Sequence, residues 1–214
     1  MATPIETTLA PDVIYARLAS NEQIKRTVEA LEANGMHAIV VENDVEARQK
    51  VAELVPAGAE VFISSSTTLN VLGITDDVDK SGRYDSVRVK LSKLDYTTQG
   101  REMQKLGATP EYVLGSVHAL TETGVALIAS ATGSQLGPYS AGAAKVVWVV
   151  GSQKIVPTVE EGMKRIEQYT VPLEDERAMK AYGMHTGIFK MLIVNREVTP
   201  GRITVVIVKE NVGF

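Results

Sequence analysis

Residues 60–69 read Glu-Val-Phe-Ile-Ser-Ser-Ser-Thr-Thr-Leu, an apolar stretch that runs directly into a row of hydroxyl side chains. The apolar part, Glu60–Ser64, predicts a short buried strand. Leu69 and Leu72 then predict a short helix that starts at the hydroxyl row and stops at Gly73. A strand followed at once by a helix is the basic unit of an α/β fold.

The preceding residues repeat this order of helix and strand. Apolar residues at Ile24, Val28 and Leu31 share one face of a predicted helix. His37–Val41 predicts a buried strand, and Asp44 is placed to cap the helix that follows it. Both predicted strands are continuously apolar rather than alternating, which is typical of a parallel sheet covered on both faces. The sequence therefore predicts a three-layer α/β fold, with a mainly parallel sheet and helices on both faces.

The rest of the chain continues this pattern. Further strands are predicted over residues Tyr112–Val117, Val125–Ala131, Lys145–Val150, Phe189–Val194 and Ile203–Val208. Pro172 is predicted to break the chain before a helix whose first turn carries acidic residues. A length of 214 residues fits one domain. We predict an N-terminal segment or helix over residues 1–19 and a single α/β domain over residues 20–214.

Composition argues against several classes of function. The chain has no cysteine, which excludes disulfides, thiolate metal sites and cysteine nucleophiles, and its three histidines are far apart in sequence. The net charge is −4 with no basic run, which argues against nucleic acid as a partner. No apolar stretch is long enough to span a membrane, and the first residues lack the pattern of a signal peptide. We therefore expect a cytoplasmic protein with no metal site and no evident cofactor.

The row of hydroxyl side chains is the first candidate site. A strand-to-helix turn brings free backbone N–H groups and hydroxyls to one point, where phosphates and carboxylates bind. In a parallel sheet such a turn also lies at the carboxyl end of the strands, where ligands usually bind. One hydroxyl would suffice if the row only capped the helix, and five exceed that need. We therefore predict that a small anionic carboxylate or phosphate ligand is bound by Ser64, Ser65, Ser66, Thr67 and Thr68.

A second turn, Thr121-Glu122-Thr123-Gly124, lies between two predicted strands. Gly124 suits a tight turn, and Glu122 would be a carboxylate at a strand end, able to act as acid, base or nucleophile. The alternative is a turn exposed to solvent without a function. We predict that this turn faces the hydroxyl row, with Glu122 as a catalytic candidate and Thr123 and Gly124 as ligand contacts.

Three further features are weaker candidates. The segment Gly133-Ser134-Gln135 offers glycine backbone and amide groups that bind anions, or it is only a surface connection. His118 ends a strand just before the second turn, where it is a candidate proton carrier or a packed, hydrogen-bonded histidine. Lys145 begins an apolar strand and either pairs with an anion or extends into water.

Several of these motifs together resemble one family. Residues 115–127 resemble the Ala-x-x-Glu-Thr-Gly-Thr core of the lactate-utilization (LUD) domain proteins. Residues 66–69 are similar to the family's Ser-x-Thr-Leu helix start, and residues 133–136 to its glycine loop. The end of the chain is similar to a single-domain branch of the family, over residues 172–178, 180–183 and 200–205. Val125 and Lys145 depart from the family's pattern, and the resemblance covers about residues 20–214.

The resemblance implies a fold like that of glucosamine-6-phosphate deaminase, ribose-5-phosphate isomerase and the CoA-transferases. In those enzymes a hydroxyl-rich turn after an early strand holds the substrate, and Ser64–Thr68 resembles it. An acidic residue on a later loop does the chemistry, which the resemblance implies for Glu122. Other family members act beside iron–sulfur and oxidoreductase subunits in the oxidation of L-lactate to pyruvate, which implies oxidoreductase partner subunits for this chain.

Three functions remain open from the sequence. The first is a LUD-type component of organic-acid metabolism that binds a small anion or a partner protein. The second is an enzyme of the CoA-transferase or sugar-phosphate-isomerase type that uses Glu122, with His118 or Lys145 assisting. The third is a structural subunit whose hydroxyl row only caps a helix. A homodimer is the default expectation for the oligomeric state.

Overall fold

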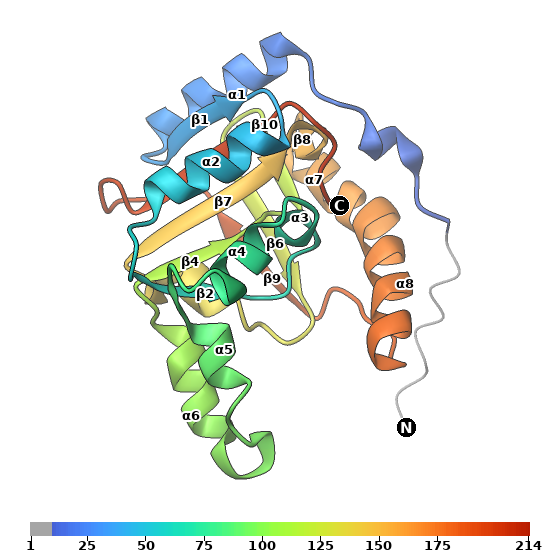
Figure 1. Ribbon diagram of the computed structural model, residues 1–214. Coiled ribbons are helices and arrows are strands. Elements are labelled where there is room, and N and C mark those ends of the chain that lie inside the picture. The colour runs from blue at the N-terminus through green and yellow to red at the C-terminus, as the bar shows by residue number, and fades with distance from the viewer. Residues whose placement is uncertain (1–9) are drawn as a thin grey trace.

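The computed structural model describes residues 10–214, and its centre is a six-stranded sheet (Figure 1). In spatial order the strands are β1 (His37–Val41), β10 (Ile203–Val208), β7 (Lys145–Gly151), β4 (Tyr112–Gly115), β2 (Glu60–Ile63) and β3 (Asp85–Ser86). Each strand runs parallel to its neighbours. The predicted mainly parallel α/β architecture is therefore confirmed.

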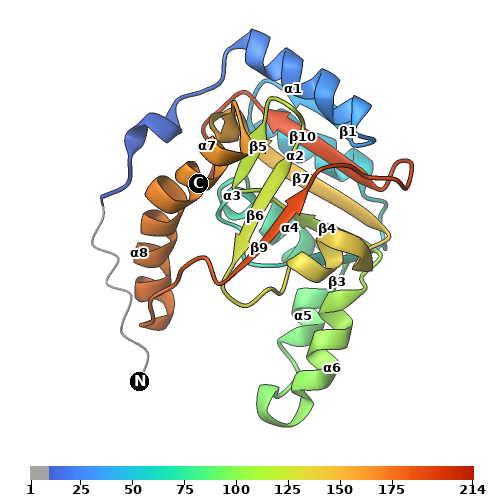
Figure 2. The same cartoon turned by 180° about the vertical axis from the view of Figure 1, so that it is seen from behind.

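A second sheet of four strands packs on the face of the first that is turned toward the viewer in Figure 2. Its strands, in spatial order, are β8 (Ile155–Val156), β5 (Ala119–Thr121), β6 (Ala126–Ser130) and β9 (Lys190–Val194). β6 runs antiparallel to β5 and β9, whereas β8 runs parallel to β5. The sequence predicts β6 and β9 as strands but not their departure from the main sheet, because an apolar stretch predicts a strand without indicating which sheet it joins.

Helices complete the outer layers (Figure 1). They are α1 (Asn21–Ala33), α2 (Asp44–Leu54), α3 (Thr67–Val71), α4 (Ile74–Lys80), α5 (Val87–Leu91), α6 (Tyr96–Ala108), α7 (Val159–Arg165) and α8 (Val171–Tyr182). The described chain also contains four short helical turns, namely η1 (Val13–Ala16), η2 (Pro138–Gly142), η3 (Ser152–Lys154) and η4 (Ile166–Thr170). No helix among the described residues has both the length and the apolar composition needed to cross a membrane.

Strand β7 shows how the layers are held together. Its side chains alternate between two cores, with Trp148 and Val150 in the core between the sheets and Val147 and Val149 in the core under α2, α3 and α4. Trp148 is fully buried, and its ring meets that of Tyr139 edge to face at 5.5 Å between centroids. A third cluster fixes α7 and η4 on the outer face of the second sheet. The continuous apolar sequence of β7 thus reflects burial on both faces.

The predicted break at Pro172 is wrong. α7, η4 and α8 follow one another without a gap from Val159 to Tyr182, and Pro172 lies in the first turn of α8. Pro172 has no backbone N–H, and it follows directly after η4, a π-helical turn where the hydrogen-bond pattern of the helix changes. The resulting long helical segment lies along one side of the molecule (Figure 1).

The predicted N-terminal segment, residues 1–19, lies in part outside the described residues. Its described part contains the single turn η1, which begins at Val13 and is capped by Asp12. The Asp12 carboxylate accepts a hydrogen bond of 3.0 Å from the backbone N–H of Ile14. From Asn21 onward the described chain forms the two packed sheets and their helices.

Candidate functional site

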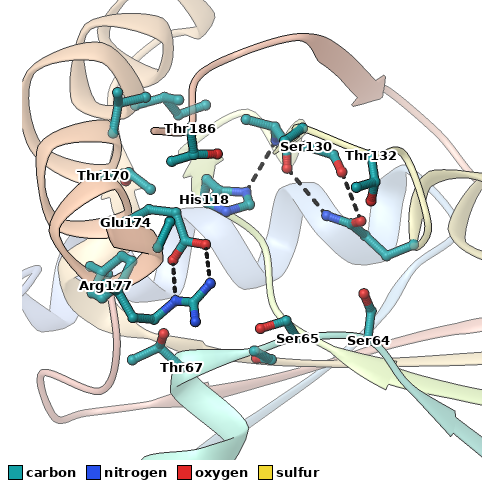
Figure 3. Close-up of a pocket in the computed structure, with 18 of the residues that line it drawn as sticks. Ser64, Ser65, Thr67, His118, Ser130, Thr132, Thr170, Glu174, Arg177 and Thr186 are labelled. Carbon is teal, nitrogen blue, oxygen red and sulfur yellow. Dashed lines mark hydrogen bonds and ion pairs between the residues drawn. The ribbon is translucent and has the colours of Figure 1, made fainter. Parts of the chain in front are cut away.

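A cleft of about 740 Å³ opens at the carboxyl ends of strands β2, β4 and β7 (Figure 3). One wall is the hydroxyl row that follows β2, and the opposite wall is formed by the loop after β6. A third side is formed by η4, α8 and residues 184–187. This is the edge of a parallel sheet at which α/β proteins usually bind ligands.

All five residues of the hydroxyl row line the cleft. The row has this place because β2 ends at Ile63 and α3 begins at Thr67, so the connecting residues lie at the sheet edge. Ser66 caps α3 by accepting a hydrogen bond of 3.4 Å from the N–H of Leu69. Ser64 reaches across the cleft, with its Oγ 2.9 Å from that of Ser134. Capping therefore occupies one of the five hydroxyls.

The loop after β6 brings Ser134 and Gln135 to the cleft, as the sequence predicts. The Gln135 amide is fixed at both ends, since Nε2 donates to the carbonyl of Ala129 at 3.2 Å and Oε1 accepts from Ser130 Oγ at 3.0 Å. Gly133 lies outside the cleft lining, and its N–H donates to Ser130 Oγ at 2.8 Å. Gly133 therefore shapes this loop through a left-handed backbone, with φ at +87°.

His118 also lines the cleft (Figure 3). Its Nδ1 accepts a hydrogen bond of 3.1 Å from the backbone N–H of Ala129, which places the proton of the neutral ring on Nε2. Burial, followed by the nearby charges of Lys154 and Arg165, lowers the pKa of His118 to about 3. At neutral pH His118 is therefore a neutral hydrogen-bond donor rather than a general base.

Lys154 is a cleft residue that sequence reasoning missed. It follows β7 in the turn η3, is 1% exposed, and lines the cleft floor. Its Nζ donates to Thr68 Oγ1 at 3.0 Å and to Ser116 Oγ at 3.1 Å. No carboxylate among residues 10–214 forms an ion pair with it. Burial and the charge of Arg165 hold the pKa of Lys154 well below its usual value.

Arg165 lies directly behind this floor at the end of α7 and is fully buried. Its Nη1 donates to the His118 carbonyl and, at 3.1 Å, to Thr170 Oγ1, and both of these residues line the cleft. Its Nη2 is buried and has no hydrogen-bond partner within the described chain. Burial lowers the pKa of Arg165 to about 10, so the guanidinium remains charged at neutral pH.

A sequence signal for Lys154 does exist. The residue comes three positions after the end of a continuously apolar strand, in Gly-Ser-Gln-Lys-Ile-Val at residues 151–156. A lysine at the carboxyl end of a central parallel strand, followed again by apolar residues, lies at the ligand edge without a nearby acidic residue. Arg165 offers no such signal, because its spacing in α7 is that of an ordinary helix-ending arginine.

The wall formed by α8 carries a paired charge. Glu174 and Arg177 form a two-pronged ion pair, with distances of 2.7 Å from Nε and 2.6 Å from Nη2 (Figure 3). This pairing raises the pKa of Arg177 through the hydrogen bonds from Glu174. Farther out, the exposed side chains of Tyr182, Met184 and Phe189 border the mouth of the cleft.

Glu122 lies outside the cleft lining, so the predicted encounter of the two turns is wrong. Its carboxylate accepts hydrogen bonds from Gln23 Nε2 at 2.9 Å and Arg26 Nε at 2.7 Å, both on α1. Burial opposes ionisation, but the hydrogen bonds from Gln23 and Arg26 outweigh it and lower the pKa of Glu122. The reason is topological, because β5 and β6 form a hairpin whose open end, at His118 and Ser130, faces the cleft.

The other predicted contacts near that turn also lie elsewhere. Thr123 Oγ1 is 2.8 Å from Thr121 Oγ1, and Gly124 takes a left-handed backbone with φ at +76° close to α1. Lys145 begins β7 at the opposite end of the sheet, and its Nζ donates to the Gly201 carbonyl at 2.7 Å. Thr123, Gly124 and Lys145 are therefore not brought together with the hydroxyl row.

The cleft contains no ready-made metal site in the part of the chain that the structure describes. No group of three or more His, Asp or Glu side chains within residues 10–214 is arranged to hold an ion. His185 is engaged by Asp175, with 2.8 Å between Nδ1 and Oδ2, and Asp175 also accepts from the Thr186 N–H. Most polar groups of the cleft are hydroxyls, amides and basic side chains, and the acidic Glu174 is paired with Arg177, so the cleft suits an anionic ligand.

Comparisons with known proteins agree with this architecture. The family model of the LUD domain matches residues 24–208. A crystal structure of a DUF162 family protein from Deinococcus radiodurans is similar, with a TM-score of 0.56 and 14% identity. The similarity covers 90% of this chain and 99% of that one, and at this identity it shows the fold alone. A comparison with curated proteins gives no match.

Proposed function

This chain belongs to the LUD-domain family, and from that premise we propose that it binds a small organic-acid anion in the cleft. We place it in organic-acid metabolism of the lactate type, as the family's name suggests. The proposal includes oxidoreductase partner subunits, a homodimer as the default assembly, and no cofactor held by this chain. It assigns binding to the hydroxyl row, to Ser134 and Gln135, and to the cleft floor.

One observation carries the proposal: two basic side chains are buried without a carboxylate, Lys154 at the cleft floor and Arg165 directly behind it. Lys154 is 1% exposed and Arg165 is fully buried, and no acidic side chain of residues 10–214 forms an ion pair with either. A buried charge is expensive unless it is paired. An anion in the cleft would supply the missing charge, and the unpartnered Nη2 of Arg165 marks the same deficit.

The rest of the cleft adds selectivity for oxygen-rich anions. The hydroxyls of Ser64, Ser65 and Thr67 line the cleft without a role in capping α3. Hydroxyls and amide N–H groups bind carboxylate oxygens well because they donate without adding charge. Arg177 is already neutralised by Glu174, so the excess positive charge near the cleft comes from Arg165, behind the floor.

Glu122 has no part in this proposal. Its carboxylate is held on α1 by Gln23 and Arg26, at the closed end of the β5–β6 hairpin. A nucleophile or base must come within hydrogen-bond reach of the reacting atoms. The geometry therefore favours a binding cleft over an enzyme of the CoA-transferase type that uses Glu122.

A panel of anions tests the proposal by thermal denaturation. Lactate, pyruvate, sugar phosphates, CoA and acyl-CoA esters would each be added to the full chain. A ligand at a hundred times its Kd stabilises by about 2.7 kcal/mol, which raises the Tm by roughly 5–10 °C for a protein of this size. We expect small carboxylates to give the largest shift.

Two variants make the result specific to the cleft. Lys154→Met should abolish the ligand-induced shift, because it removes an amine from the cleft floor. Lys145→Met is the matched control, since it removes the same group from the opposite end of β7 and should leave the shift intact. A flat response across the whole panel would refute anion binding in the cleft.

A further inference from the structure

We propose that Lys154 forms an imine with the carbonyl carbon of a 2-oxo acid bound in the cleft. This inference rests on the proposed function, because it names the class of organic acid that the same cleft accepts. It adds a covalent step that anion binding alone does not require. The inference follows from the hydrogen bonds of the Lys154 side chain.

The two hydroxyls beside Lys154 can only accept hydrogen bonds from it. Thr68 directs its own hydroxyl hydrogen to the carbonyl of Val212 at 3.3 Å, and Ser116 directs its own to the carbonyl of Val117 at 3.3 Å. Each hydroxyl oxygen is therefore an acceptor for Lys154 Nζ, at 3.0 and 3.1 Å. These two bonds account for two N–H groups of the amine.

The third position on the nitrogen determines its chemistry. A charged ammonium group would carry a third N–H, and no acceptor for it is found in the described part of the chain. An uncharged amine instead has two N–H groups and a lone pair, which fits the two acceptors and leaves the lone pair free. Because Lys154 lines the cleft, this lone pair is available to a bound ligand.

The surroundings favour the uncharged form. Lys154 is almost completely buried, and its neighbour Arg165 is a buried cation that carries no compensating carboxylate within residues 10–214. Both effects hold the pKa of Lys154 well below its usual value. A lysine that is desolvated or lies beside another cation is the form of this side chain that attacks carbonyl groups.

The step balances without any other reactant. The amine lone pair attacks the carbonyl carbon, and the carbonyl oxygen takes up one amine proton to give a carbinolamine. The C–O bond then breaks, and the oxygen leaves with the second amine proton as water. The product is a carbon–nitrogen double bond to Lys154, and no oxidation or reduction takes place.

A 2-oxo acid satisfies both properties of the cleft floor. Its carboxylate suits the hydroxyls that line the cleft, in the field of the buried Arg165 behind the floor, and its carbonyl carbon can approach the Lys154 amine, which lines the cleft. A 2-hydroxy acid of the same size has the same carboxylate but no carbonyl carbon to attack. Pyruvate and lactate therefore form a matched pair of probes that differ in this one group.

Borohydride trapping tests the imine directly. The full-length protein would be incubated with pyruvate, reduced with sodium borohydride, and digested for peptide mass mapping. We expect a reduced pyruvate adduct on Lys154 at about tenfold or higher yield than on any other lysine, because the uncharged amine is the reactive form. Lactate under the same conditions should give no adduct.

Variants and outcomes separate the imine from simple anion binding. Lys154→Arg should lose the adduct, whereas Lys145→Met should keep it on Lys154. Because the site is mapped in the unaltered protein, the test does not depend on a variant that folds poorly. An absent adduct at Lys154, or equal labelling of exposed lysines, would overturn the imine.

The two proposals can fail separately. If pyruvate and lactate both raise the Tm but pyruvate leaves no adduct, the imine is refuted and anion binding stands. If no anion raises the Tm and pyruvate leaves no adduct on Lys154, both proposals are refuted.

Discussion

Replacing Lys154 by methionine should make the protein more stable at neutral pH. Methionine has nearly the length and volume of the lysine side chain but carries no charge to desolvate. Lys154 is 1% exposed and has no acidic partner among residues 10–214. The substitution Lys154→Met therefore removes a cost of folding while it keeps the packing of the cleft floor.

The magnitude follows from two opposing effects. The pKa of Lys154 is depressed by burial and Arg165, so between this folded pKa and 10.5 the unfolded chain binds more protons than the folded chain. Stability then rises with pH by about 1.4 kcal/mol per pH unit over that window. Methionine removes this penalty but loses two hydrogen bonds, to Thr68 and Ser116, worth about 1 kcal/mol each. We expect a net gain of about 1–3 kcal/mol at pH 7.

Urea and thermal denaturation at several pH values measure this gain. A change of 1–3 kcal/mol corresponds to a rise in Tm of roughly 3–10 °C for a chain of this size. The difference between variant and wild type should grow as the pH falls from 9 to 6, because wild type must release the Lys154 proton on folding and this release costs more at lower pH. Lys145→Met serves as the control for loss of a lysine at an exposed strand end.

Two results would refute the reasoning. A variant that is less stable than wild type at every pH would show that the hydroxyl partners contribute more than burial costs. An unchanged pH dependence would show that the Lys154 amine is as charged in the folded chain as in the unfolded one.

Three further outcomes are expected. Burial lowers the pKa of His118 to about 3, so the unfolded chain binds more protons than the folded chain below pH 6.5. Lowering the pH from 7 to 5 should therefore destabilise wild type by about 2 kcal/mol more than it destabilises His118→Gln. Urea denaturation at both pH values measures this difference. Glu122→Gln removes an ion pair with Arg26, whose side chain is half exposed, so the free energy of unfolding should fall by less than about 1 kcal/mol. The anion-induced Tm shift should not change, and its loss would show that Glu122 belongs to the site. A Cβ at Gly115 would lie 1.6 Å from the hydroxyl of buried Tyr139, so Gly115→Ala should cost roughly 1–3 kcal/mol in chemical denaturation, and a neutral effect would contradict the packing described.

Unpaired polar groups gather at the end of β7. Of the four buried side-chain atoms without a hydrogen-bond partner in the described residues, three belong to Ser152, Gln153 and Arg165. Such atoms are uncommon in folded proteins because each costs about 1–3 kcal/mol. Their position beside Lys154 and the cleft floor fits a site that gives up stability for binding.

The sequence by itself determined the main sheet and the hydroxyl wall of the cleft. Continuous apolar stretches such as His37–Val41 and Ile203–Val208 predict strands of a parallel sheet, and both are observed at the predicted bounds. Ile203–Val208 is almost fully buried inside the sheet, whereas His37–Val41 lies at its edge and is partly exposed. The position of Ser64–Thr68 at the carboxyl edge also follows, because a strand-to-helix turn in a parallel sheet has no other place. Local sequence suffices where a feature depends on neighbours along the chain.

Tertiary structure alone decided which distant residues meet. Glu122 and the hydroxyl row are separated because β5 and β6 fold into a hairpin in a second sheet, which their apolar pattern does not reveal. The pKa of Lys154 is lowered because the packed fold buries its amine and because α7 places the charged Arg165 behind it, with no ion-paired carboxylate for either in the described chain. Burial and charge pairing are properties of the packed whole, so no reading of neighbouring residues could assign them.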